Sequence, residues 1–350
     1  MLLFVIITTI ALAIACVLMI ALLIALRLGF ELHERRAARR NDALRGHLLE
    51  MLMGEPLSAM KAERRLVRMQ GREFEAVRTL ALEMLPKLRG ESRERLIDLL
   101  RTKGGIADAV RLTRSSSSVR RCRGAFALGM LADRSHESRV LELLDDPNFL
   151  VRRVATRALG NMESEAAVGD LLRLSREEPR LSRDVAYALH RIGPAAAPRM
   201  REELRICIRD DEWTRSGELA ATVLGLLGDY QSREVLEAGL QAKRPAFAAA
   251  CADALGAICD PQAEGALHAA LSQPAPEVRA AAARALGSMG SEASVPGLLA
   301  LTDQENPIAS RDAANAMLNL GTSGVQALQA SRSSYAREAL ALAAVRGRRA

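Results

Sequence analysis

Histidine and cysteine side chains could hold a metal ion or act as nucleophiles, and in this chain both are few and scattered. The two His-Glu dipeptides, His33-Glu34 and His136-Glu137, could each supply an imidazole and a carboxylate to a transition metal. They stand far apart, however, and no two histidines have the spacing of a shared ligand set. The five cysteines include no C-x-x-C pair. We therefore predict no metal site, no disulfide framework and no cofactor.

The sequence motifs of phosphate binding and nucleophilic catalysis are also absent. The chain contains no G-x-x-x-x-G-K-[ST] loop, no G-x-S-x-G elbow and no H-E-x-x-H helix. Such motifs would cradle a phosphate, expose a serine nucleophile or hold a zinc-bound water. We expect no enzymatic activity and no small-molecule substrate.

One short stretch has the composition of a protein-contact site: Asp210, Asp211, Glu212 and Trp213. It places the only tryptophan of the chain beside three carboxylates, and tryptophan is enriched at interface hot spots. Two interpretations remain open. Trp213 anchors a partner protein, or it covers a gap beside a longer helix while the carboxylates favour the N-terminal end of the next helix.

A repeating unit determines where this stretch lies. The segment Pro276–Gly287 begins with proline, carries small apolar residues at helical spacing and ends in Ala-Leu-Gly, where we expect Gly287 to form a left-handed C-cap. Equivalents of Leu286 recur at steps of 31, 31, 31, 30, 35, 31, 31 and 31 residues, and the longest step contains Trp213. These marker positions are Leu66, Ile97, Leu128, Leu159, Leu189, Leu224, Leu255, Leu286 and Met317.

This regularity predicts an all-α fold, an α-solenoid of about nine helical hairpins. Aromatic residues make up only 3% of the chain, and alternating β-branched runs are missing, so no sheet is expected. The predicted pairs run from Ser58–Gln70 with Glu73–Leu88 to Ser310–Leu320 with Gly324–Ala330, followed by a last helix, Ser334–Val345. Each pair buries part of its apolar surface only by stacking on its neighbours.

The sequence pattern of the repeat resembles that of a known protein family. The pattern D-x-x-x-x-V-R-x-x-A-x-x-A-L-G from Asp146 to Gly160, whose second half recurs from Val278 to Gly287, resembles the HEAT repeat. The period resembles the short HEAT-like form of phycobilisome lyases and many bacterial proteins, over about residues 57–330. The resemblance implies a solenoid with a concave protein-binding face and no chemistry by itself. We predict that the arginines of this motif, such as Arg152 and Arg279, are structural and pair with loop aspartates between repeats.

The N-terminus predicts a membrane anchor. Residues 2–26 carry no charge, and a helix of that length would span about 37 Å, enough for a hydrocarbon core of about 30 Å. We expect a transmembrane anchor over residues 1–27, a juxtamembrane basic linker helix over 28–55 and the solenoid over 56–346. The positive-inside rule then places the N-terminus outside and the solenoid in the cytoplasm. The residues expected to flank the membrane and contact anionic headgroups are Arg27, Arg35, Arg36, Arg39 and Arg40.

The distribution of charge argues against nucleic-acid binding. Residues 27–103 contain 18 Lys or Arg and 12 Asp or Glu, whereas residues 104–350 contain 31 and 30. The overall charge of +7 is thus concentrated near the N-terminus, and no basic stripe follows the array, as phosphate binding along it would require. Arginine outnumbers lysine 45 to 4, a bias of GC-rich bacteria that favours an inner-membrane location.

Together these features predict a non-enzymatic, membrane-anchored scaffold or adaptor that binds another protein. Envelope-polysaccharide (glycosyltransferase) and signalling complexes are the expected settings. The alternative is an enzyme subunit of the phycobilisome-lyase-like class that is active only with a partner. A metal enzyme is not expected: deoxyhypusine hydroxylase, a HEAT-repeat di-iron enzyme, uses His-Glu pairs at matching repeat positions, whereas the two pairs in this chain are out of phase.

Overall fold

A computed structural model describes residues 19, 27, 42–210, 215–304 and 306–347. Every element in these ranges is a helix, with no strand, so the predicted all-α class is confirmed. The chain divides into two compact units, Met1–Asp108 and Ala109–Ala350.

The first unit contains helical residues 42–53 and four helices given at the end of this paragraph. Glycines with positive φ begin α3 and α4, Gly71 at 56° and Gly90 at 60°, where a residue with a side chain would be strained. Lys103 closes the α4 end by donating to the carbonyls of Val67 and Met69, each at 2.9 Å. The helices are α2 (Pro56–Arg68), α3 (Gly71–Met84), α4 (Gly90–Thr102) and α5 (Gly105–Thr113), of which α5 continues into the second unit.

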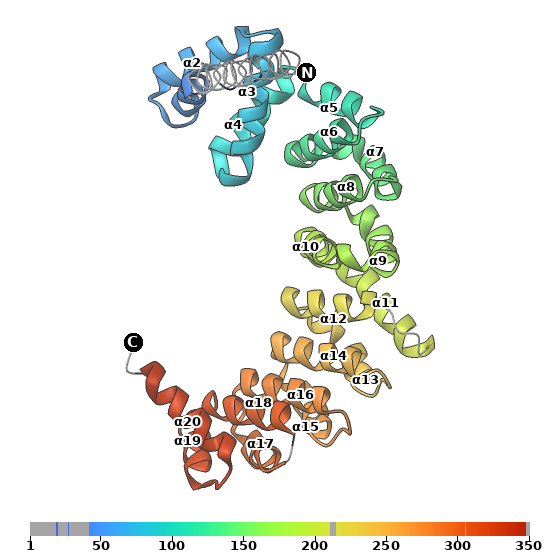
Figure 1. The fold of residues 1–350 in the computed structure, drawn as a ribbon, viewed down its shortest axis with the longest axis vertical. Coiled ribbons are helices and arrows are strands. Elements are labelled where there is room, and N and C mark those ends of the chain that lie inside the picture. The colour runs from blue at the N-terminus through green and yellow to red at the C-terminus, as the bar shows by residue number, and fades with distance from the viewer. Residues whose placement is uncertain (1–18, 20–26, 28–41, 211–214, 305, 348–350) are drawn as a thin grey trace, which may run out of the picture. The chain divides into compact units, whose positions relative to one another are not determined.

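The second unit is a stack in which one helix of each pair carries the marker residue. Consecutive marker helices pack against each other from α6 to α18, and each connecting helix from α7 to α17 packs against the marker helix that follows it (Figure 1). Helix α9 also contacts α12, and α19 packs against α18 and α20. The marker helices are α6 (Ser118–Leu131), α8 (Phe149–Asn161), α10 (Ser182–Ile192), α12 (Arg215–Leu227), α14 (Pro245–Ile258), α16 (Pro276–Met289) and α18 (Pro307–Leu318). The connecting helices are α7 (Glu137–Leu141), α9 (Val168–Glu177), α11 (Ala197–Asp210), α13 (Arg233–Gly239), α15 (Glu264–Ala270), α17 (Val295–Thr302) and α19 (Gly321–Ala330), and α20 (Ser334–Gly347) follows them.

The glycine that recurs in the Ala-Leu-Gly motif has a different role from the one predicted. Gly287 lies inside α16, and the left-handed cap is Gly290, with φ of 71°. A Cβ on Gly287 would stand 2.6 Å from the Cβ of Ala316, which is closer than van der Waals contact allows. Gly287 is therefore required by the close approach of α18, and the predicted C-cap at this position was wrong.

The same close approach recurs along the stack. Added Cβ atoms would meet the Cα of the facing alanine at 2.5–2.8 Å. The pairs are Gly129–Ala158, Gly160–Ala188, Gly225–Ala254, Gly256–Ala285 and Gly287–Ala316. Between α10 and α12 the corresponding positions hold His190 and Val223, and this is the junction with the 35-residue step. In the longer unit, His190 and Val223 thus stand at the positions that hold glycine and alanine at the other junctions.

The predicted membrane location requires correction. In the described part of the chain, no helix combines the length and apolar character needed to cross a bilayer. Helix α16, for example, has 14 residues, which extend about 21 Å, and it buries its apolar face against α14 and α18. The single-pass inner-membrane location, with the N-terminus outside and the solenoid in the cytoplasm, is not supported. Of the residues predicted to flank the membrane, Arg27 is exposed, and Arg35, Arg36, Arg39 and Arg40 lie outside the described residues, as does most of the predicted span.

Candidate functional site

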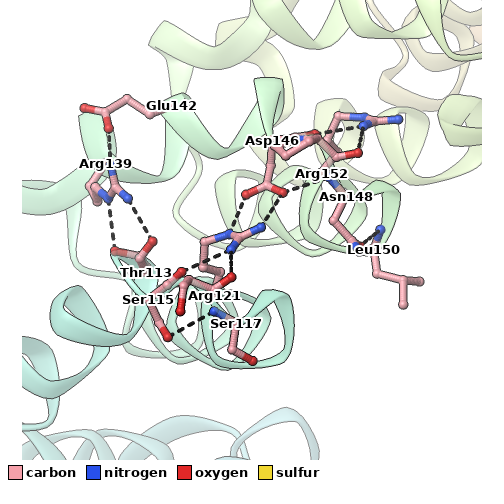
Figure 2. A network of polar contacts seen from close by, with 12 residues as sticks. Thr113, Ser115, Ser117, Arg121, Arg139, Glu142, Asp146, Asn148, Leu150 and Arg152 are labelled. Carbon is pink, nitrogen blue, oxygen red and sulfur yellow. Dashed lines mark hydrogen bonds and ion pairs between the residues drawn. The ribbon is translucent and has the colours of Figure 1, made fainter.

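An arginine seven residues before the marker links one repeat to the next. Arg121 of α6 holds Asp146 with two bonds, Nε to Oδ2 at 2.6 Å and Nη2 to Oδ1 at 2.9 Å (Figure 2). Its Nη1 also donates to the carbonyls of Ser115 and Ser116, at 3.0 and 2.8 Å. Arg121 therefore ties the connection before α6 to the connection before α8.

Equivalent arginines make the same kind of contact. Arg152 donates to the carbonyls of Asp146 and Pro147 and pairs with Glu178 at 2.7 Å. Arg279 donates to the carbonyls of Gln273 and Pro274, both at 2.8 Å. The carboxylate at the position equivalent to Glu178 would be Glu305, which lies outside the described residues. The bonds of Arg152 and Arg279 are structural, as predicted, although their partners are loop carbonyls and a glutamate rather than aspartate side chains.

Asp146 is the most strongly engaged carboxylate of this network. Burial disfavours its charged form, but hydrogen bonds from Arg121 and from the Asn148 amide, together with the charges of Arg121 and Arg152, outweigh burial and lower its pKa. An ionised, paired Asp146 is what a stabilising inter-repeat contact requires. The charged groups of this network are therefore engaged in contacts between repeats.

Two clusters resemble parts of a catalytic triad but do not form one. Ser294 Oγ lies 3.1 Å from His268 Nε2, and Glu264 Oε1 lies 3.4 Å from the same nitrogen. A triad needs the carboxylate on the other ring nitrogen, so that the histidine can accept the serine proton. His136 likewise has its serine and its carboxylate on the same ring nitrogen, because Ser135 and Asp133 both contact Nδ1, at 3.1 and 2.6 Å.

Two of the thiols are held in their neutral form. Burial raises the pKa of the Cys251 thiol, and burial together with the charge of Asp146 raises that of Cys122; a neutral thiol is a poor nucleophile. Within the described ranges, no three His, Cys, Asp or Glu side chains are grouped so that they could hold a metal ion.

The exposed face of α6, α8 and α10 carries aromatic and aliphatic side chains. Two residues before each marker, these helices expose Phe126, Arg157 and Tyr187, and the two aromatic residues are 39% and 47% exposed. The Tyr187 hydroxyl lies 3.4 Å from Asn161 Oδ1, so the tyrosine reaches across to α8. Val119 and Leu150, in the first turns of α6 and α8, are also exposed. Apolar side chains on a solvent-facing helix row are typical of a protein-contact surface.

Arginines surround these apolar residues. Arg123 of α6, Arg153 of α8 and Arg183 of α10 are exposed, and the structure gives none of them an ion-pair partner. Arg157, in contrast, pairs with Asp184 of the next marker helix, α10, at 2.5 Å. We call the surface formed by Phe126, Tyr187 and the three unpaired arginines the basic–aromatic face. Sequence reasoning missed it, although the marker register would have placed Phe126 and Tyr187 at equivalent positions.

The contact site predicted from the sequence is only partly described. Asp210 ends α11 and pairs with its neighbour Arg209 at 2.8 Å; this hydrogen bond lowers the pKa of Asp210. Asp211, Glu212 and Trp213 lie outside the described residues. A surface hollow of about 340 Å³ lies nearby between α11 and α13, lined by residues that include Ile208, Arg209 and Val235.

The fold and the surface together define a class of protein: an α-solenoid of stacked helical pairs whose solvent-facing helices carry apolar and basic side chains. Helical repeats of this class generally serve as binding surfaces. The chain belongs to the HEAT-repeat family, because the family model described as HEAT repeats matches residues 106–190, 140–220, 234–319 and 264–345.

Several solved structures are similar to this chain at low identity. Human deoxyhypusine hydroxylase in complex with glycerol is 20% identical, with a TM-score of 0.32 over 76% of this chain and 99% of that one. Importin beta is 14% identical, with a TM-score of 0.48 over 81% of this chain and 47% of that one. The CpcE and CpcF complex of phycocyanin lyase from a Nostoc species is 17% identical, with a TM-score of 0.29 over 75% and 91%. Among curated proteins, none matches this chain.

Proposed function

We propose that this chain is a non-catalytic scaffold that binds another protein along the solvent-facing side of its marker helices. The observation that carries the proposal is the basic–aromatic face, where Phe126 and Tyr187 are exposed at equivalent positions of α6 and α10. Exposing an aromatic ring to water forgoes the free energy of burial, and a bound protein would recover it. Aromatic residues and arginine are also the residue types most enriched at interface hot spots.

The chemistry of the described residues supports binding rather than catalysis. The arginine, aspartate and histidine clusters described above are engaged in contacts between or within repeats. Trp213 is proposed as a second contact point, independent of the basic–aromatic face. The narrower prediction of an accessory to an envelope-polysaccharide or signalling complex depended on the membrane anchor, so the proposal is limited to protein binding.

Site-specific photocrosslinking in the native host tests the proposal. A benzoylphenylalanine at position 126 or 187 is expected to capture the same discrete protein, because both positions lie on one face. Tyr230 is a suitable control position, because it is an exposed aromatic residue, 62% accessible, in the turn before α13. Absence of a discrete adduct at both 126 and 187, or the same adduct from 230, would contradict the proposal. Co-purification of a chromophore that the chain transfers to a partner would instead favour the lyase-type alternative.

A further inference from the structure

We propose that the basic–aromatic face binds an extended acidic segment of the partner protein, with apolar side chains between its carboxylates. The inference rests on the proposed function and adds the chemical nature of the partner. The ligand is a peptide segment rather than a folded surface or a nucleic acid.

The charges of the basic–aromatic face favour an acidic ligand. The acidic residues beside it are already paired: Asp184 with Arg157 at 2.5 Å, and Glu178 with Arg152 at 2.7 Å and with Arg180 at 2.9 Å. Within the described ranges, no carboxylate forms an ion pair with the exposed guanidinium groups of Arg123, Arg153 and Arg183. Arginine binds carboxylates with two parallel hydrogen bonds. Carboxylates of a partner protein can therefore pair with these three arginines.

The geometry of the stack sets the spacing of the ligand. Arg123, Arg153 and Arg183 lie on the three consecutive marker helices α6, α8 and α10, of which α8 packs against both others. Packed helices stand about 8–10 Å apart. An extended peptide advances about 3.3 Å per residue. A segment crossing the helices would therefore meet a new arginine about every third residue. The side chains of the ligand between its carboxylates can then pack against Phe126 and Tyr187.

The limited extent of the face argues against a nucleic-acid ligand. The next marker helix, α12, presents Glu218 and Thr222 at the positions equivalent to Arg183 and Tyr187. On α14 the latter position holds Asp253, which is bonded to Arg284 of α16. The phosphate backbone of a nucleic acid that continued past α10 would meet these acidic side chains. A short acidic peptide would contact only α6, α8 and α10.

Fluorescence anisotropy with a defined peptide tests the inference. The probe is a labelled peptide of four Glu-Leu-Ser triplets, and the matching peptide of Lys-Leu-Ser triplets is the ligand control. The triple variant Arg123→Gln, Arg153→Gln, Arg183→Gln of the full chain is expected to bind the acidic probe about tenfold more weakly, equivalent to about 1.4 kcal/mol. The affinity of the unmodified chain should fall as salt rises, because exposed charges are screened.

A second triple variant controls for the loss of charge. Arg199, Arg332 and Arg337 are exposed, lie on other parts of the second unit, and have no ion-pair partner in the structure. Changing all three to Gln should leave binding of the probe unchanged. A third variant, Phe126→Ala with Tyr187→Ala, should weaken binding of the Leu-containing probe more than that of a Glu-Gly-Ser peptide.

Three outcomes would overturn the inference: no binding of the acidic probe, equal loss in the two triple variants, or tighter binding of a single-stranded RNA of the same length. Failure of the inference is distinguishable from failure of the proposed function. If the photocrosslinked protein still binds the Arg123, Arg153, Arg183 variant with unchanged affinity, the scaffold function stands and the acidic segment is refuted. If no protein is captured from the face, the proposed function itself fails.

Discussion

Gly256 of α14 lies so close to Ala285 of α16 that no side chain fits between them. A Cβ added to Gly256 would stand 2.5 Å from the Cα and 2.6 Å from the Cβ of Ala285. Because Cα belongs to the backbone, the contact cannot be relieved by rotating a side chain. The glycine therefore sets the separation of the two helices.

Replacing Gly256 by alanine is expected to destabilise the second unit. Overpacking a tight contact costs about 1–3 kcal/mol, more than the gain of up to about 1 kcal/mol from the better helix propensity of alanine. Urea denaturation followed by circular dichroism would measure the change. Gly265→Ala is the matched control, since Gly265 lies in helix α15 with nothing within 4 Å of its added Cβ. This control should be neutral or slightly more stable, and an equal loss in both variants would contradict the packing explanation.

Arg121→Gln should destabilise the chain more than the same change at a neighbouring exposed arginine, because it removes charged hydrogen bonds and leaves the buried carboxylate of Asp146 without its main partner. Its sequence neighbour Arg120 is exposed and makes no ion pair in the structure. Arg120→Gln removes the same charge and is expected to stay within about 0.5 kcal/mol of the unmodified chain. Equal stabilities of the two variants, by the same denaturation assay, would show that the Arg121 network contributes nothing.

Low pH should weaken the contact between Arg121 and Asp146. The folded-state pKa of Asp146 is lowered from an ordinary value of 3.8, so its contribution to stability is present above that value and is lost as the pH falls through the folded pKa. Asp146→Asn is therefore expected to show a shallower loss of stability between about pH 5 and pH 3 than the unmodified chain. Asp303→Asn, at an exposed position without an ion pair in the structure, should keep the original slope. An unchanged slope in Asp146→Asn would count against the assignment.

Thiol labelling should separate the buried and exposed cysteines. Cys251 is fully buried in α14, and burial raises the pKa of its thiol, whereas Cys259 is exposed at the end of the same helix. Under native conditions, Cys251 should react with a maleimide about a hundredfold or more slowly than Cys259, because labelling requires local opening. Site-resolved mass spectrometry would give the two rates, and in urea they should converge. Similar native rates would mean that α14 is not packed as described.

Much of the local structure could be predicted because it depends on short-range patterns. The prediction of a helix from Ser182 to Ile192 agrees with α10 at both ends. Pro245, Pro276 and Pro307 begin α14, α16 and α18, where the missing N–H costs no hydrogen bond. Residue spacing encodes such features directly.

What the sequence by itself determined is thus the repeat, its period and the family to which the chain belongs. Only the tertiary structure decided why Gly287 is a glycine, because the reason is a neighbouring helix 29 residues later in the chain. It likewise showed that Arg157 pairs with Asp184, whereas no carboxylate among the described residues pairs with Arg123, Arg153 or Arg183. Pairing and exposure depend on contacts between repeats, and a one-dimensional pattern of residue types does not specify which side chains of adjacent repeats meet.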